Sequence, residues 1–156
     1  MNVRITILSL LLPFASCHSL DAAAPDAKGS DTVLRKLFVE PSASSLAGGK
    51  ARLTTSVLTP ESGAYVGDYQ LKVTPYFFKS EKGKISINAS EHGLRKLTQN
   101  KPVAFTGKAV TDGTKKTRPI KVEATPSGSD RGALIISIPT ENGALVFETS
   151  YRFDER

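Results

Sequence analysis

The sequence predicts an all-β fold, either a single antiparallel β-sandwich or a small barrel of about eight strands, with one short helix near residues 90–98. Three observations support this class. Apolar and polar residues alternate through most of residues 32–156, which is typical of half-buried strands. Turn-forming residues separate the alternating stretches at short spacing. A length of 156 residues with a 39% hydrophobic share is compatible with one domain and one core.

In the first half of this domain the pattern predicts four strands and the helix, and the fourth strand is the stretch in which Ile85 and Ile87 alternate with Ser86 and Asn88. Strands are expected near residues 33–39 and 51–58, where the alternation is least regular. The next alternating stretch predicts four inward-facing side chains: Tyr69, Leu71, Val73 and Phe77. In the helical segment, Ser90 is expected to cap the N-terminal end, and Arg95 with Lys96 suits the C-terminal end.

Residues 102–153 predict a four-stranded meander. A four-residue loop at 113–116 would place Ala109 opposite Ile120 in the first of its hairpins. The same register would place two lysines directly opposite each other on the outer face: Lys108 and Lys121. Because like charges in directly opposed positions repel, this arrangement favours an anionic partner or two side chains that splay into water.

The last hairpin of the meander carries a strong turn signal. Asn142-Gly143 is typical of a two-residue type I′ turn, in which both central residues need positive φ. Such a turn pairs Glu141 with Ala144 and places Ile138 opposite Phe147. We therefore expect Phe147 in the core and positive φ at Gly143.

The N-terminus predicts export. Residues 1–17 contain a positive charge at Arg4, an apolar run over residues 5–14 and then small residues. This order is typical of a secretory signal peptide, and the run is too short to span a bilayer. Residues 18–31 are small, polar and proline-containing, so we expect a flexible tether between the signal and the β domain of residues 32–156.

The end of the apolar run, Phe14-Ala15-Ser16-Cys17, resembles the lipobox of bacterial lipoproteins, with Phe14 where that family usually has Leu. The resemblance covers residues 1–17 only. It implies that Cys17, the single cysteine of the chain, is acylated and holds the protein to a membrane. Ordinary signal cleavage before His18 or near residues 22–24 is the alternative, and it would give a secreted protein without an anchor.

The positive charge lies in the β domain. The whole chain has a net charge of +6, whereas residues 32–156 hold 19 basic and 12 acidic residues and so carry +7. Such a domain favours anionic partners, such as a glycan, lipid headgroups or an envelope protein. The alternative is that the basic residues, which are dispersed along the chain, only solvate the exposed strand faces and protect sheet edges. Nucleic acid is not expected, because the lysine clusters lack interleaved aromatic residues. The candidate binding residues are Lys72, Lys108, Lys121 and Tyr76.

Catalytic chemistry finds little support in the sequence. His92 is the only histidine in residues 32–156, and no motif of a serine hydrolase or a zinc protease occurs. We therefore assign no catalytic residue, metal ligand or cofactor. The favoured hypothesis is a non-catalytic module in the periplasm or cell envelope. The alternatives are an exported hydrolase with an unidentified carboxylate pair and a small barrel that carries an apolar ligand.

Overall fold

The computed structural model describes residues 35–140 and 143–154, which lie within one compact unit of the chain. The expected signal peptide, its Cys17 and the tether of residues 18–31 fall outside the described residues. Anchoring and export therefore stay predictions. No helix in the described part of the chain has the length and apolar character needed to cross a membrane.

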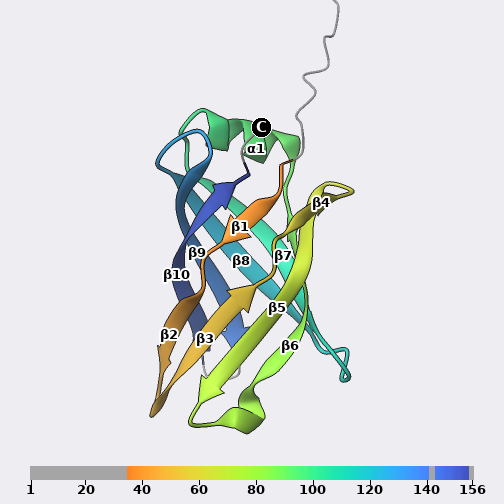
Figure 1. The fold of residues 1–156 in the computed structure, drawn as a ribbon, viewed down its shortest axis with the longest axis vertical. Helices are drawn as coiled ribbons and strands as arrows, with labels where there is room; N and C mark the ends of the chain where they lie inside the picture. The colour runs from red at the N-terminus through yellow and green to blue at the C-terminus, as the bar shows by residue number, and fades with distance from the viewer. Residues whose placement is uncertain (1–34, 141–142, 155–156) are drawn as a thin grey trace, which may run out of the picture. The chain divides into compact units, whose positions relative to one another are not determined.

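The described residues form one antiparallel sheet that curls into a half-barrel (Figure 1). Its strands are β1 (Leu37–Val39), β2 (Ser42–Leu46), β3 (Gly49–Thr55), β4 (Thr59–Glu61), β5 (Ala64–Thr74), β6 (Glu81–Asn88), β7 (Val103–Thr111), β8 (Thr117–Pro126), β9 (Arg131–Thr140) and β10 (Gly143–Phe153). They follow the order β1-β10-β9-β8-β7-β6-β5-β3-β2, and β4 pairs with β5. The expected all-β class is confirmed, with ten strands because the N-terminal part is divided into short pieces.

The two ends of the strand order, β1 and β2, are consecutive in the chain. β1 is bonded on both sides, because Leu37 pairs with Phe153 of β10 and also forms an isolated bridge with Leu58. β2 pairs with β3, and its Ser42 Oγ donates a hydrogen bond to the Glu148 carbonyl of β10 at 2.6 Å. One short segment of chain therefore contacts both edges of the curled sheet.

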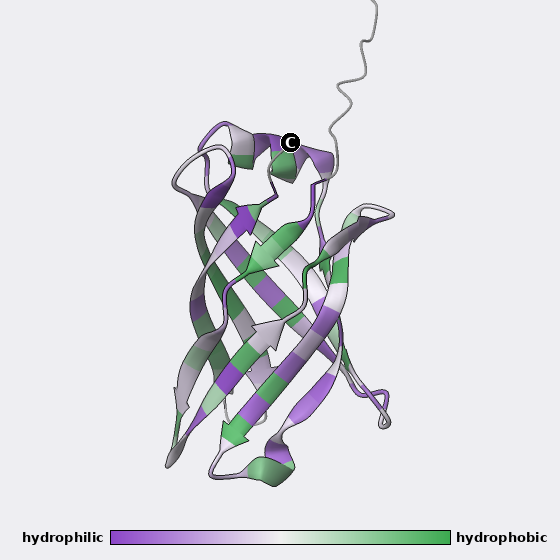
Figure 2. Cartoon of the chain, viewed as in Figure 1, coloured by the Kyte–Doolittle hydropathy of each residue, from purple (hydrophilic) through white to green (hydrophobic). Residues whose placement is uncertain are grey.

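The concave side of the sheet is filled with apolar side chains. The largest fully buried ones come from four strands and the β3–β4 connection: Phe147, Leu58, Ile85, Ile120, Ile136 and Val122. Figure 2 shows the alternation of hydrophobic and hydrophilic residues along the strands that produces this arrangement. The apolar interior leaves a cavity of about 20 Å³, close to the volume that one water molecule needs.

Helix α1 (Glu91–Thr98) covers one end of the curled sheet (Figure 1). Its bounds and its cap agree with the sequence-based prediction, since Ser90 Oγ accepts a hydrogen bond from the Gly93 amide at 3.1 Å. Leu97 is buried and Leu94 is half-buried against the core. The helix thus closes the apolar end of the barrel, where a bare sheet would expose its core.

The four-stranded meander is confirmed, but the predicted register of its last hairpin is wrong by two residues. Gly143 pairs with Thr140, and Phe147 pairs with Ile136 in place of Ile138. Gly143 has the expected positive φ, at 120°, yet it already belongs to β10. Gly143 thus lies in a strand and not at a central position of a turn, and a glycine with positive φ also fits the position after a turn.

The hairpin between β7 and β8 shows the same shift. Ala109 pairs with Arg118, not with Ile120 as predicted. The Thr111 amide donates to the Lys116 carbonyl at 2.9 Å, so the loop comprises residues 112–115. Lys115 adopts a positive φ of 55°, which allows the chain to reverse one residue earlier than predicted.

A further correction concerns Phe77, which the alternation places on the inner face. β5 ends at Thr74, and Pro75 has no N–H to donate to a neighbouring strand. A short 3₁₀ turn, η1 (Phe77–Lys79), follows and directs the Phe77 side chain into solvent. Figure 2 shows hydrophobic colour in η1, at the end of the sheet opposite α1.

Candidate functional site

An aromatic tip, defined as Tyr76, Phe77 and Phe78, protrudes from the end of the sheet opposite α1. The Phe77 and Phe78 side chains are 74% and 82% exposed. Among the other described residues, the most exposed large apolar side chain is Val146 at 42%. Scattered exposed apolar residues are normal, whereas two adjacent phenyl rings in solvent indicate an interaction surface.

The tip has a defined conformation. The Tyr76 and Phe78 rings meet edge to face, with centroids 6.1 Å apart, and Lys79 Nζ lies 5.4 Å from the centre of the Tyr76 ring. Tyr76 is half-buried against the β2–β3 turn, where a Cβ on Gly48 would lie only 3.1 Å from the Tyr76 hydroxyl. Within the tip, Tyr76 therefore packs against the β2–β3 turn, while Phe77 and Phe78 are exposed to solvent.

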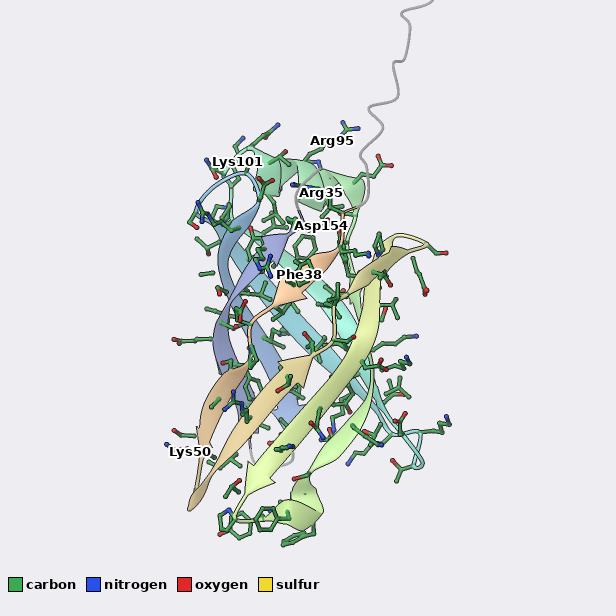
Figure 3. All side chains as sticks on the ribbon, viewed as in Figure 1. Arg35, Phe38, Lys50, Arg95, Lys101 and Asp154 are labelled. Carbon is green, nitrogen blue, oxygen red and sulfur yellow. The ribbon has the colours of Figure 1, made fainter. Side chains whose placement is uncertain are left out.

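A basic patch adjoins the tip, on η1 itself and on the outer face of β3, β5 and β6. It consists of five exposed residues: Lys50, Arg52, Lys72, Lys79 and Lys82. Figure 3 shows Lys50 at the same end of the sheet as η1, far from Arg35 and Arg95 at the other end. Lysine and arginine thus gather around the only strongly exposed aromatic pair in the described residues.

The register places these charges close together, with one acid at the edge of the patch: Asp112, whose amide donates to the Lys82 carbonyl at 2.9 Å on the far side of β6. Arg52 of β3 lies directly opposite Lys72 of β5. Lys82 of β6 pairs with Gln70, the outward-facing residue next to Lys72 on β5. On the other side of β3, the residues that pair with Lys50 and Arg52 are uncharged: Ser45 and Ala43. Like charges in such positions destabilise a sheet, so this surface is positive at a cost in stability.

The predicted pairing of Lys108 with Lys121 is wrong. Lys108 lies opposite Pro119, and Lys121 lies opposite Thr106. The two lysines remain exposed on the outer face as diagonal neighbours. Strand β6 lies between Lys72 on β5 and Lys108 on β7. Lys72 is near the end of β5 that leads into the aromatic tip. Of the predicted binding residues, Lys72 and Tyr76 therefore share one site, and Lys108 and Lys121 belong to another part of the surface.

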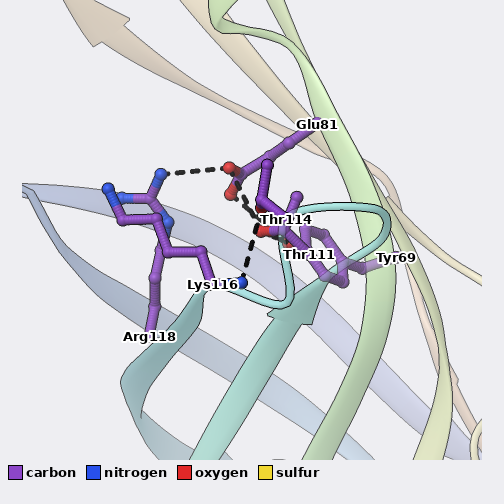
Figure 4. Close-up of polar contacts among 6 residues, drawn as sticks. All are labelled: Tyr69, Glu81, Thr111, Thr114, Lys116 and Arg118. Atoms are coloured by element: carbon purple, nitrogen blue, oxygen red, sulfur yellow. Dashed lines mark hydrogen bonds and ion pairs between the residues drawn. The ribbon is translucent and has the colours of Figure 1, made fainter.

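A second candidate is a polar cluster that links four strands (Figure 4). Arg118 Nη2 donates to Glu81 Oε2 at 3.0 Å, and both side chains are mostly buried. The Tyr69 hydroxyl donates to Glu81 Oε1 at 3.3 Å and lies 3.1 Å from Thr111 Oγ1. Burial raises the pKa of Tyr69, so its phenol stays protonated and can act as a donor. The sequence pattern did not reveal this cluster, because Glu81-Lys82-Gly83 is typical of a turn, whereas the structure places these residues in β6.

The polar cluster borders a surface hollow of about 420 Å³ between β5, β6 and the β7–β8 turn. Two of the lining residues are carboxylates, Glu81 and Asp112. Glu81 is engaged by Arg118, Tyr69 and Thr111, so its oxygens already have partners. This arrangement cross-links the open end of the curled sheet, which is a structural role that the geometry explains fully.

The described residues contain no cluster of side chains that could bind a metal ion. Across residues 35–140 and 143–154, no three His, Cys, Asp or Glu side chains gather where they could hold an ion. His92 is exposed at the start of α1. No protein-family model, curated protein or solved structure matches this chain.

Proposed function

We propose that this protein is a non-catalytic, exported module that is anchored in the cell envelope through Cys17 and binds an anionic partner through its basic patch. The observation that carries the proposal is the patch itself: five exposed basic side chains, of which Lys50, Arg52 and Lys72 have only uncharged or basic cross-strand partners. The lipobox resemblance and the tether supply the anchor. Binding at the outer surface then requires no opening of the core.

The two alternatives have less support. A carrier of an apolar ligand needs an internal cavity of some hundreds of Å³, whereas the interior space is about 20 Å³. A hydrolase needs a carboxylate that is free to exchange protons with a substrate. The best placed carboxylate, Glu81, is instead held by Arg118 and two hydroxyl groups.

The proposal is tested by retention on immobilised heparin, used as a generic anionic polymer. The wild-type chain should bind at low salt and elute as screening increases, because the Debye length is about 8 Å at physiological ionic strength. Arg52→Glu with Lys72→Glu should abolish retention, whereas Lys101→Glu, at the opposite end, should change it little. Lys108→Glu with Lys121→Glu should have an intermediate effect. A wild-type chain that flows through at low salt contradicts the proposal.

The anchor is tested separately by fractionation of cells. Cys17→Ala should release the protein from the membrane fraction, because it removes the thiol that would be acylated. Mass analysis of the mature wild-type protein should show an acylated residue at Cys17. An unmodified N-terminus beyond Cys17 would refute the anchor without affecting the binding proposal.

A further inference from the structure

We propose that the aromatic tip inserts Phe77 and Phe78 into the interface of an anionic lipid bilayer while the basic patch binds the headgroups. This inference rests on the proposed function, because it names the partner of the same surface. It assigns the two phenyl rings a role that binding to an anionic polymer alone does not require.

The first argument is the shape of the tip. Two phenyl rings project from η1, a turn that its own backbone stabilises through three hydrogen bonds: Phe77 N to the Pro75 carbonyl, Lys79 N to the Tyr76 carbonyl and Ser80 N to the Phe77 carbonyl. Ser80 Oγ also accepts a bond from the Val73 amide at 2.9 Å. The tip is thus already ordered, and insertion would cost little conformational entropy.

The second argument is the position of the charges around the rings. Lys79 follows Phe78 directly, and Lys82 begins the outward face of β6 three residues later. Arg52 and Lys72 lie on the adjoining strands. Long basic side chains next to an apolar insertion can keep their charges at headgroup level, and each basic residue near an anionic surface strengthens binding roughly fivefold.

The third argument is the comparison with other occupants. A second copy of this chain would bring an equally positive patch against the first, and the repulsion opposes such a contact. A polysaccharide would satisfy the charges but would leave the edges of both phenyl rings in water. An anionic bilayer supplies negative charge and apolar depth within one surface, so it matches both parts of the site.

The chain has no tryptophan, which makes a direct probe of insertion available. The Phe78→Trp variant, in the full chain with Cys17→Ala, should show a blue-shifted emission on vesicles of phosphatidylglycerol and phosphatidylcholine. On vesicles of phosphatidylcholine alone the shift should be much smaller. Emission that does not change on the anionic vesicles would overturn the proposal, because the ring would then remain in water.

Co-sedimentation with the same vesicles measures the contribution of each part. Phe77→Ser with Phe78→Ser should lower the partition coefficient at least tenfold, since each buried phenyl group contributes roughly that factor. Lys79→Glu with Lys82→Glu should also lower it at least tenfold. The matched controls are Val57→Ser with Val146→Ser for exposed apolar area and Lys101→Glu for charge. Both controls should bind as the parent chain does.

The heparin assay separates this inference from the proposed function. Phe77→Ser with Phe78→Ser should keep heparin retention while it loses vesicle binding. If the double serine variant binds vesicles as the parent does, the insertion is refuted and the polymer-binding proposal stands. If the parent binds anionic vesicles but not heparin, the insertion stands and polymer binding is refuted. Concentration-dependent self-association that the serine variant abolishes would identify a second copy as the occupant and overturn the bilayer proposal.

Discussion

Replacement of Phe147 by Ala tests whether the concave side of the curled sheet is a packed core. The Phe147 side chain has no solvent exposure, and it lies on β10 opposite Ile136, which is also fully buried. Loss of the ring removes its transfer free energy and leaves a cavity that rigid strands on both sides cannot close. We expect the free energy of unfolding to fall by about 3–5 kcal/mol.

Phe77→Ala is the matched control, since it is the same substitution at a side chain that is 74% exposed. Because only about a quarter of the Phe77 side chain is buried, its removal should lower the free energy of unfolding by less than about 1 kcal/mol. Urea unfolding followed by circular dichroism measures both values. If Phe147→Ala costs no more than Phe77→Ala, the described core packing is wrong.

Two further predictions concern the backbone and alkaline pH. Gly143→Val should lower the free energy of unfolding by more than about 1 kcal/mol in urea titrations, because the backbone φ of 120° at this position is strained for a residue with a side chain. No atom lies within 4 Å of the added Cβ, so the cost comes from the backbone alone. An unchanged stability would show that Gly143 adopts another φ. Burial raises the pKa of Tyr151 above its ordinary value of 10.0, so stability is fully present below pH 10 and is lost as the pH rises through the folded-state pKa. Thermal unfolding of Tyr151→Phe between pH 9 and 11 should show a shallower decline than wild type, and identical slopes would contradict the assignment.

The period-two pattern was sufficient to identify the core but not the pairing partners. Phe147 is buried as predicted, although it pairs with Ile136 in place of Ile138. A turn misplaced by one residue shifts the register by two, and a shift of two leaves every side chain on the same face. The hydrophobic pattern therefore has no information that distinguishes the two registers, and only the turn conformation does.

The candidate site was less accessible to sequence reasoning. Lys72 and Tyr76 were identified, but the charge opposite Lys72 comes from Arg52 on β3, and the partner of that strand is set by long-range topology. Phe77 was placed in the core because the alternation was extended past Pro75, where the strand ends. Local patterns describe faces well, whereas a site assembled from β3, β5 and η1 depends on how those elements meet.

The double contact of the β1–β2 segment has a consequence for the order in which the protein can fold. Synthesis delivers Leu37–Val39 early and its partner strand, Gly143–Phe153, more than a hundred residues later. A nascent chain can form the β7–β8 hairpin from local contacts, but it cannot join first strand to last until its final residues have emerged. Contacts of such sequence separation slow folding. The unfinished chain would therefore keep its first strand without its β10 partner until Gly143–Phe153 has emerged.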